Sequence, residues 1–252
     1  MITAVILDWA GTTVDHGSLA PVAAMRMLFS SVGIDVPTEE IRASMGLHKK
    51  DHIRAIATAH GRGNDVEALY TAFIPKQMES LVEHSAVIAG VGEAVERMRG
   101  RGLKIGSTTG YNREMLDYVK DRAKAQGYAP DCALCPDDVG GGRPMPWMCF
   151  AAAVFLRVYP MGTMVKIGDT ETDIAEGRNA GMWTIGVART GNEVGLSQRE
   201  WDALGDGARD GLLRAARDKL YAAGADYVID TVAEVDDTLT SIDERLARGE
   251  RP

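Results

Sequence analysis

The chain has 252 residues, of which 45% are hydrophobic and 25% charged, and its net charge is −8. This length suits one large α/β domain or a core with a small accessory domain, and the acidic balance argues against a broad nucleic-acid-binding surface. No apolar run approaches the ~18 residues of a membrane span, and the N-terminus has no signal-peptide pattern, so we expect a cytoplasmic protein with no membrane or nucleic-acid partner.

Short apolar runs alternate with helical patterns along most of the chain. The runs have the character of strands buried on both faces, and they lie at residues 4–7, 103–108, 164–168, 183–187 and 226–229. Amphipathic helical patterns lie at 91–99, 112–126, 146–158 and 173–179, and a capping box at Ser197 begins another helix. This alternation predicts an α/β fold with a Rossmann-like parallel sheet and helices on both faces.

The strand signal disappears between residues 18 and 88. Helical patterns fill this region, at 21–31, 38–45, 50–60 and 66–84. We therefore predict an all-helical cap domain over residues 18–89, inserted into an α/β core domain formed by residues 1–17 and 90–252.

Carboxylates follow the strands at the edge of the sheet where ligands bind. In an open parallel sheet this edge is at the carboxyl ends of the strands. Asp8 ends the first strand, Asp169 follows a later one, and Asp173 is just beyond it. Three close carboxylates repel one another unless a cation is present, and oxygen ligands beside a phosphate suit Mg²⁺. With Mg²⁺ bound, Asp8 is placed to attack phosphorus and form an aspartyl-phosphate.

The same edge offers groups for holding phosphate. Thr109 and the Gly110 amide lead into a helix, whose N-terminus favours anions. Arg143, just before a predicted helix, supplies a positive charge for the phosphoryl group.

Together these motifs resemble the haloacid dehalogenase superfamily. They are D-x-x-G-T-T from Asp8, T-T-G from Thr108, the Arg143–Pro144 pair, and G-D-T-x-x-D from Gly168. Most phosphatases of that superfamily carry, two residues after the nucleophile, an aspartate that protonates the departing alkoxide. Here that position is Ala10, which cannot act as an acid.

A lysine in the predicted cap explains how the chemistry can proceed without that acid. A lysine facing the metal site can condense with an aldehyde to form an iminium. If a carbon–phosphorus bond next to the iminium breaks, the electrons flow into nitrogen and leave a neutral enamine, so no oxyanion departs. Lys49 and Lys50 are both candidate amines by composition alone.

A sharper resemblance, to the phosphonatase family, chooses between them. It rests on Leu7 to Asp15, on Met45-Gly46-Leu47-x-Lys49-x-Asp51-His52, on Ser107 to Tyr111, on Gly142-Arg143-Pro144-x-Pro146-Trp147, and on Gly168 to Thr170, and it extends past Trp183. The resemblance implies hydrolysis of the carbon–phosphorus bond of phosphonoacetaldehyde to acetaldehyde and phosphate, in 2-aminoethylphosphonate degradation. Its register selects Lys49 as the Schiff-base residue.

The resemblance also assigns the remaining site residues. It implies Mg²⁺ ligation by Asp8, the Ala10 carbonyl, Asp169 and Asp173, and catalytic roles for Asp8, Lys49, His52 and Tyr111, with His52 or Tyr111 moving a proton. It implies substrate or phosphate contacts by Thr12, Met45, Thr109, Gly110 and Arg143. Ser18 occupies a position where many members carry cysteine. A homodimer through the cap is also implied, with apolar residues such as Met25, Met27, Leu28 and Phe29 available for it.

Other functions remain open at this stage. A phosphate monoester hydrolase or phosphosugar mutase of the same superfamily is the alternative, although Ala10 then leaves alkoxide departure without its acid. A binding module that has lost catalysis is disfavoured because all the carboxylates and Arg143 are present. Dehalogenation through an aspartyl ester needs no Mg²⁺ and does not explain Asp169, Asp173 and Lys49 together.

Overall fold

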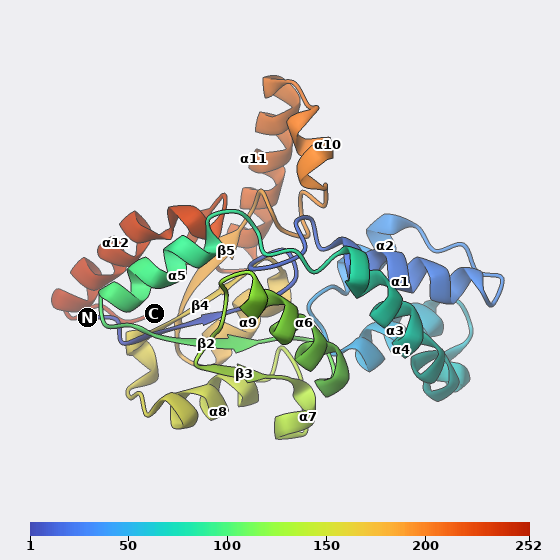
Figure 1. The fold of residues 1–252 in the computed structure, drawn as a ribbon, viewed down its shortest axis with the longest axis horizontal. Coiled ribbons are helices and arrows are strands. Elements are labelled where there is room, and N and C mark those ends of the chain that lie inside the picture. Colours follow the sequence, from blue (N-terminus) through green and yellow to red (C-terminus); the bar gives the residue numbers. More distant parts are fainter.

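Six parallel strands form the centre of the protein in a computed structural model, which describes residues 1–252 (Figure 1). Their order across the sheet is β3-β2-β1-β4-β5-β6. The strands are β1 (Ala4–Leu7), β2 (Lys104–Thr108), β3 (Cys132–Leu134), β4 (Met164–Gly168), β5 (Trp183–Val187) and β6 (Tyr227–Ile229). The order turns back at β1, because β2 pairs with one edge of β1 and β4 with the other. The predicted α/β fold with a Rossmann-like parallel sheet is confirmed.

Helices cover both faces of this sheet. The side chains of β1 show why, because they point alternately to the two faces and are apolar on both. Val5 and Leu7 point into a large apolar cluster shared with α5 (Val91–Gly100) and α12 (Val235–Ala247). Ala4 and Ile6 point to the opposite face and pack with α8 (Trp147–Leu156). Figure 1 shows α5 and α12 above the sheet and α8 below it. The other core helices are α6 (Arg113–Ala125), α7 (Pro136–Val139), α9 (Glu171–Asn179), α10 (Gln198–Asp202) and α11 (Asp206–Ala222).

A block of helices, which we call the helical block, follows β1 directly and lies to one side of the sheet (Figure 1). It consists of α1 (Leu19–Ser30), α2 (Thr38–Ala43), α3 (Lys49–Ala59) and α4 (Val66–Glu83), close to the predicted patterns. Two segments link it to the core and run side by side, with the Asp15 amide bonded to the Ala86 carbonyl at 3.0 Å and the Ile88 amide to the Thr13 carbonyl at 2.9 Å. The division into domains at residues 17/18 and 89/90 stays a prediction.

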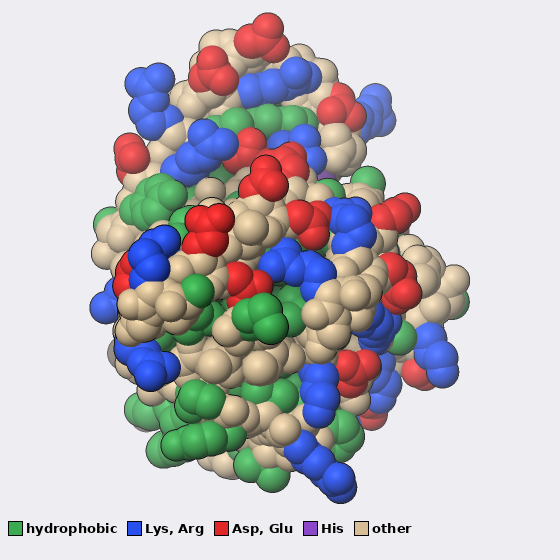
Figure 2. All heavy atoms as spheres, turned by 90° about the vertical axis from the view of Figure 1, so that its left-hand side faces the viewer, with side chains coloured by type: hydrophobic (Ala, Val, Ile, Leu, Met, Phe, Trp, Pro, Cys, Tyr) green, Lys and Arg blue, Asp and Glu red, His purple; other side chains and the backbone are tan.

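The apolar faces of the helical block are used inside the molecule. Met25, Leu28 and Phe29 are fully buried, and Met27 is the exposed member of the set suggested for a dimer contact. Exposed apolar side chains gather instead along α8, on the face seen in the lower part of Figure 2, and include Trp147, Phe150, Val154 and Phe155. None of the helices combines the length and apolarity needed to cross a bilayer.

Candidate active site

The three predicted carboxylates meet beyond the carboxyl ends of neighbouring strands. Asp8 directly follows β1, and Asp169 directly follows β4. Asp173 lies in the first turn of α9, where its carboxylate bonds the Thr170 hydroxyl and completes a capping box. All three are buried, and one oxygen from each lies within 4.8 Å of the others.

The electrostatics of this cluster fit a cation. Burial raises the pKa of Asp8, and the nearby Asp173 charge raises it further. Burial also raises the pKa of Asp169 well above its ordinary value, with the Asp8 charge adding to the shift. Buried carboxylates of this kind ionise fully only when positive charge is supplied. A divalent metal bound by the cluster would supply it, and its oxygen ligands suit Mg²⁺.

Asp169 accepts three hydrogen bonds from two segments, the connection between β1 and α1 and the loop after β5. The hydroxyls of Thr12 and Ser18 donate to its carboxylate at 3.1 and 3.0 Å, and the backbone amide of Asn192 donates at 2.7 Å. Thr12, predicted to contact phosphate, therefore supports a candidate metal ligand in this structure. Ser18 was noted only as a departure from the family pattern, and its contact with Asp169 shows that it belongs to the site.

Arg143 binds the carboxylates directly. Its Nη2 donates to Asp8 Oδ1 at 2.6 Å, its Nη1 lies 3.0 Å from Asp173 Oδ1, and its Nε donates to Glu176 Oε2 at 2.9 Å. These contacts aim the guanidinium at Asp8, where a transferred phosphoryl group would sit. Burial alone would raise the pKa of Asp173, but Arg143 and Lys166 outweigh it and hold that pKa below its usual value.

Lys166 and Glu176 are the charged residues that sequence reasoning missed. Lys166 is fully buried in β4, and its Nζ lies 3.0 Å from Asp173 Oδ1 and 3.2 Å from Glu176 Oε2. Its Nζ also donates to the Thr108 hydroxyl at 2.9 Å. The signal was present in the sequence, because a lysine inside an otherwise apolar strand buried on both faces needs buried partners.

The loop that carries Lys49 is docked tightly onto the core. The Lys49 amide donates to the Gly110 carbonyl at 3.2 Å, and the Thr172 hydroxyl donates to the Met45 carbonyl at 3.1 Å. A Cβ on Gly110 would lie 2.3 Å from the Leu47 carbonyl oxygen, so only glycine permits this approach. The helical block therefore meets the core at the predicted phosphate-binding turn.

Burial separates the two adjacent lysines. Lys49 is 3% exposed, whereas Lys50 points away and pairs with Glu67 at 2.6 Å. Burial lowers the pKa of Lys49 from 10.5 to about 8, although the Asp8 charge opposes the shift. The amine lies 5.5 Å from the centre of the Tyr111 ring and 4.0 Å from the Met45 sulfur.

His52 and Tyr111 are both buried with unused polar atoms. Neither ring nitrogen of His52 has a hydrogen-bond partner, and the Tyr111 hydroxyl has none. Burial and the neighbouring Lys49 lower the pKa of His52 to about 3, so its ring is neutral at pH 7. Burial also raises the pKa of Tyr111 well above its usual value, so the phenol keeps its proton.

A small cavity lies between these groups. Its lining joins core residues to residues of the helical block: Asp8, Ala10, Ser18, Pro21, Met45, Gly46, Lys49, Thr109, Gly110, Tyr111, Arg143, Asp169 and Thr170. Most of the predicted site residues therefore surround one small space. Thr12, His52 and Asp173 do not line it and lie behind the residues that do.

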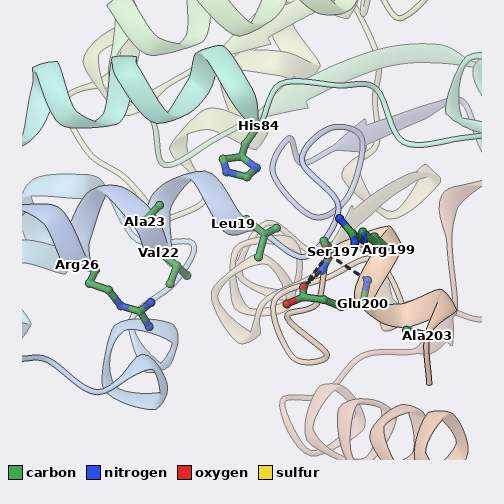
Figure 3. Close-up of a pocket in the computed structure, with 9 residues that line it drawn as sticks. All are labelled: Leu19, Val22, Ala23, Arg26, His84, Ser197, Arg199, Glu200 and Ala203. Atoms are coloured by element: carbon green, nitrogen blue, oxygen red, sulfur yellow. Dashed lines mark hydrogen bonds between the residues drawn. The ribbon is translucent and has the colours of Figure 1, made fainter. Parts of the chain in front are cut away.

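A larger hollow lies elsewhere, between α1 and α10, with His84 at its edge (Figure 3). It is open to solvent, and Glu200, its one carboxylate, is engaged with Ser197 in a capping box. The Ser197 hydroxyl donates to Glu200 within that capping box, and the clustered carboxylates that could hold a metal are Asp8, Asp169 and Asp173, away from this hollow. The smaller cavity is therefore the candidate active site.

The fold and the carboxylate site define a haloacid dehalogenase-like hydrolase, and the sequence model of that family matches residues 2–181. Two curated relatives named phosphonoacetaldehyde hydrolase match almost end to end. The protein from Bacillus cytotoxicus is 44% identical over 97% of both chains, and that from Nitratidesulfovibrio vulgaris is 40% identical over 100% of this chain and 94% of its own. The chain belongs to the phosphonoacetaldehyde hydrolase family of haloacid dehalogenase-like hydrolases.

Solved structures agree with this placement. The crystal structure of a phosphonoacetaldehyde hydrolase-like protein from Oleispira antarctica superposes with a TM-score of 0.97 at 40% identity, covering 100% of this chain and 96% of that one. A β-phosphoglucomutase from Clostridium difficile superposes with a TM-score of 0.72 at 17% identity, over 98% and 100% of the two chains, and shows the shared fold alone.

Proposed function

We propose that this protein hydrolyses the carbon–phosphorus bond of phosphonoacetaldehyde to acetaldehyde and phosphate. The observation that carries the proposal is the buried Lys49 amine, with its lowered pKa, which shares one small cavity with Asp8 and Ala10. The relatives that bear the name of this activity match the whole chain. The biological role that follows is 2-aminoethylphosphonate degradation.

The first chemical step is carbon–nitrogen bond formation by Lys49. Its neutral amine adds to the aldehyde carbon, and loss of water gives a protonated imine, the Schiff base. A pKa of about 8 leaves about one amine in ten unprotonated at pH 7, compared with about one in 3000 at the ordinary value of 10.5. Burial of Lys49 thus raises the supply of nucleophile about 300-fold.

The second step breaks the bond to phosphorus. The Asp8 carboxylate attacks the phosphorus atom, and the electron pair of the carbon–phosphorus bond moves into the iminium to give an enamine and an aspartyl-phosphate. The enamine takes a proton on carbon, and water releases acetaldehyde from Lys49. A second water then hydrolyses the aspartyl-phosphate to inorganic phosphate and restores Asp8.

Tyr111 and His52 are the residues that assist proton transfer around the imine. Tyr111 lines the cavity, and its free hydroxyl can pass a proton to or from the aldehyde oxygen. His52 lies one helical turn beyond Lys49 on α3, and its neutral ring, with neither nitrogen bonded, can relay a proton by accepting at one nitrogen while donating from the other. Met45, also in the lining, is proposed to pack against the two-carbon chain of the substrate.

Mg²⁺ is the cofactor that we propose, held by Asp8, the Ala10 carbonyl and Asp169, with Asp173 as a further ligand. When bound, it neutralises phosphoryl charge and keeps the carboxylates ionised. Arg143, Thr109 and the Gly110 amide bind the remaining phosphoryl oxygens, and Thr12 orients Asp169 through the bond described above.

A product assay tests the proposal. Purified protein with Mg²⁺ and phosphonoacetaldehyde should release acetaldehyde and phosphate in equal amounts, and a chelator should stop the reaction. Lys49→Met should abolish turnover, whereas Lys50→Met should retain it because Lys50 is paired with Glu67 outside the cavity. Rapid hydrolysis of simple phosphate monoesters, undiminished in Lys49→Met, would instead favour a phosphatase.

The remaining expectations are also proposals. We propose a cytoplasmic homodimer and a cap domain over residues 18–89 that closes on the core. Because Met25, Leu28 and Phe29 are buried, a dimer through the helical block would use other side chains, among them the exposed Met27. Light scattering of the purified protein measures the subunit number directly.

A further inference from the structure

Arg42 reaches from the helical block into the core. It lies in α2, and its Nη1 donates to the carbonyl of Gly17 at 3.0 Å and to the side-chain oxygen of Asn192 at 3.0 Å. Nη1 also lies 3.2 Å from the Asn192 carbonyl, and Nη2 donates to the Gly195 carbonyl at 2.9 Å. One guanidinium therefore binds a linker residue and both ends of the core loop 192–195.

The contact between Arg42 and the loop 192–195 is reciprocal, and the two are closely packed. The Asn192 side-chain amide donates back to the Arg42 carbonyl at 3.3 Å. A Cβ on Gly195 would lie 2.6 Å from the guanidinium carbon of Arg42, and the φ of +66° at Gly195 also favours glycine. The planar fork of arginine can satisfy several acceptors at once, which the single ammonium of lysine cannot do in the same geometry.

The loop 192–195, which Arg42 binds, also contacts the candidate metal ligand Asp169. The backbone amide of Asn192 donates to Asp169 Oδ2 at 2.7 Å. A Cβ on Gly191 would lie 2.5 Å from the Asp169 Cβ, so the loop backbone packs directly on this residue. One residue earlier, the Thr190 hydroxyl donates to the Gly11 carbonyl at 2.8 Å, which ties the loop to the turn after β1.

We propose that Arg42 is a positioning residue that couples the docked helical block to the metal site. It fixes Asn192, and the Asn192 amide fixes the carboxylate of Asp169. Asp169 therefore has its full set of partners only while α2 is docked on the loop 190–195. Movement of the helical block away from the core breaks the Arg42 contacts and loosens a metal ligand in the same event.

The test compares Arg42→Met and Arg42→Lys with a matched control, Arg26→Met. Arg26 belongs to the same helical block and lines the open hollow of Figure 3, but its guanidinium bonds only Thr38 of that block. Calorimetric titration with Mg²⁺ alone, without substrate, is the first readout. Arg42→Met should bind Mg²⁺ about 10- to 100-fold more weakly, as is usual when an outer-shell partner is lost, and Arg42→Lys should fall between it and the wild type.

Hydrogen–deuterium exchange followed by mass spectrometry is the second readout. Exchange should rise in residues 45–49 and 190–195 of Arg42→Met and stay unchanged in β1 and β4, while Arg26→Met should match the wild type in both readouts. Unchanged Mg²⁺ affinity would overturn the proposal, and so would an increase in exchange spread evenly through the core strands. If Arg42→Met does not fold, Arg42→Lys and Asn192→Ala carry the test, and their effects on Mg²⁺ affinity should be non-additive.

The inference rests on the Mg²⁺ site of the proposed function but not on its substrate or reaction, which add only one consequence, a fall in kcat/KM in Arg42→Met. Both readouts above need no substrate. A wild-type protein inactive on phosphonoacetaldehyde would therefore refute the proposed function and leave the role of Arg42 to be decided by metal binding and exchange.

Discussion

Removal of the Lys166 charge is expected to destabilise the protein severely. Lys166 and its partners Asp173 and Glu176 have fully buried side chains, and its Nζ lies 3.0 and 3.2 Å from the two carboxylates. In Lys166→Met the side chain keeps a similar volume, but the two carboxylates lose a buried partner. Breaking a buried ion pair from one side costs about 3–5 kcal/mol. A typical domain has only about 5–15 kcal/mol of stability in total, so the loss should be obvious.

Urea unfolding monitored by circular dichroism measures this cost. The matched control is Lys219→Met, because Lys219 also pairs with two carboxylates, Glu171 and Glu193, but its side chain is 44% exposed. An exposed pair is worth at most about 1 kcal/mol, so the control should change little. The double variant Lys166→Met/Glu176→Gln removes one charge of each sign and should recover at least half of the loss. A Lys166→Met variant as stable as the control would refute this reading of the charge cluster.

Three further predictions concern the site and its surroundings. The value of kcat/KM should rise with pH, reach half of its maximum near pH 8 and level off above about pH 9, because burial sets the pKa of Lys49 to about 8 and the neutral amine is the nucleophile. A profile flat between pH 6 and 9 would contradict this. Burial raises the pKa of Asp15 from 3.8 to about 7 in the folded protein. The folded state therefore binds this proton more tightly than the unfolded chain, which adds to the free energy of unfolding at low pH. About 4 kcal/mol of this contribution is lost as the pH rises from 3.8 to 7. Asp15→Asn should therefore gain stability relative to the wild type between pH 4 and 8 in urea unfolding, and a constant difference would count against the pKa shift. Gly110→Ala should lower kcat/KM about 100-fold because its Cβ would lie 2.3 Å from the Leu47 carbonyl, whereas Gly100→Ala meets no atom within 4 Å and should behave as wild type in the same assay.

Two features of the sequence predicted most of the fold and of the candidate site: the pattern of apolar residues and the polar residues that follow the strands. The runs ending at Leu7, Thr108 and Gly168 became neighbouring strands, and the polar residues that follow them line one cavity. This works because parallel strands buried on both faces have a continuous apolar signature, and their carboxyl ends meet at one edge. The capping box at Ser197 likewise marked the start of α10.

The elements that escaped prediction have weak or interrupted patterns. β3 has only three residues, Cys132–Leu134, which is too short for an apolar run to stand out. α11 has only a narrow apolar stripe, in which Ala216 and Leu220 are the buried residues. α12 is the exception, with a regular apolar stripe at Val235, Leu239 and Ile242.

Within the site, sequence reasoning found residues that follow strands or stand in motifs and missed those brought in from a distance. Lys166 is an exception, because it lies within β4, where its buried position requires charged partners; these are Asp173 and Glu176. Arg42 and Asn192 are 150 positions apart, and nothing in either local pattern announces their contact. Such pairs depend on how the helical block sits on the core, which only the folded structure shows.

Trapping of the Schiff base tests the central claim most directly. Borohydride added with phosphonoacetaldehyde should inactivate the enzyme irreversibly, and peptide mass spectrometry should find the reduced adduct on Lys49. Borohydride or substrate alone should leave activity intact. An adduct on Lys50, or steady turnover in borohydride with no adduct on Lys49, would contradict the mechanism.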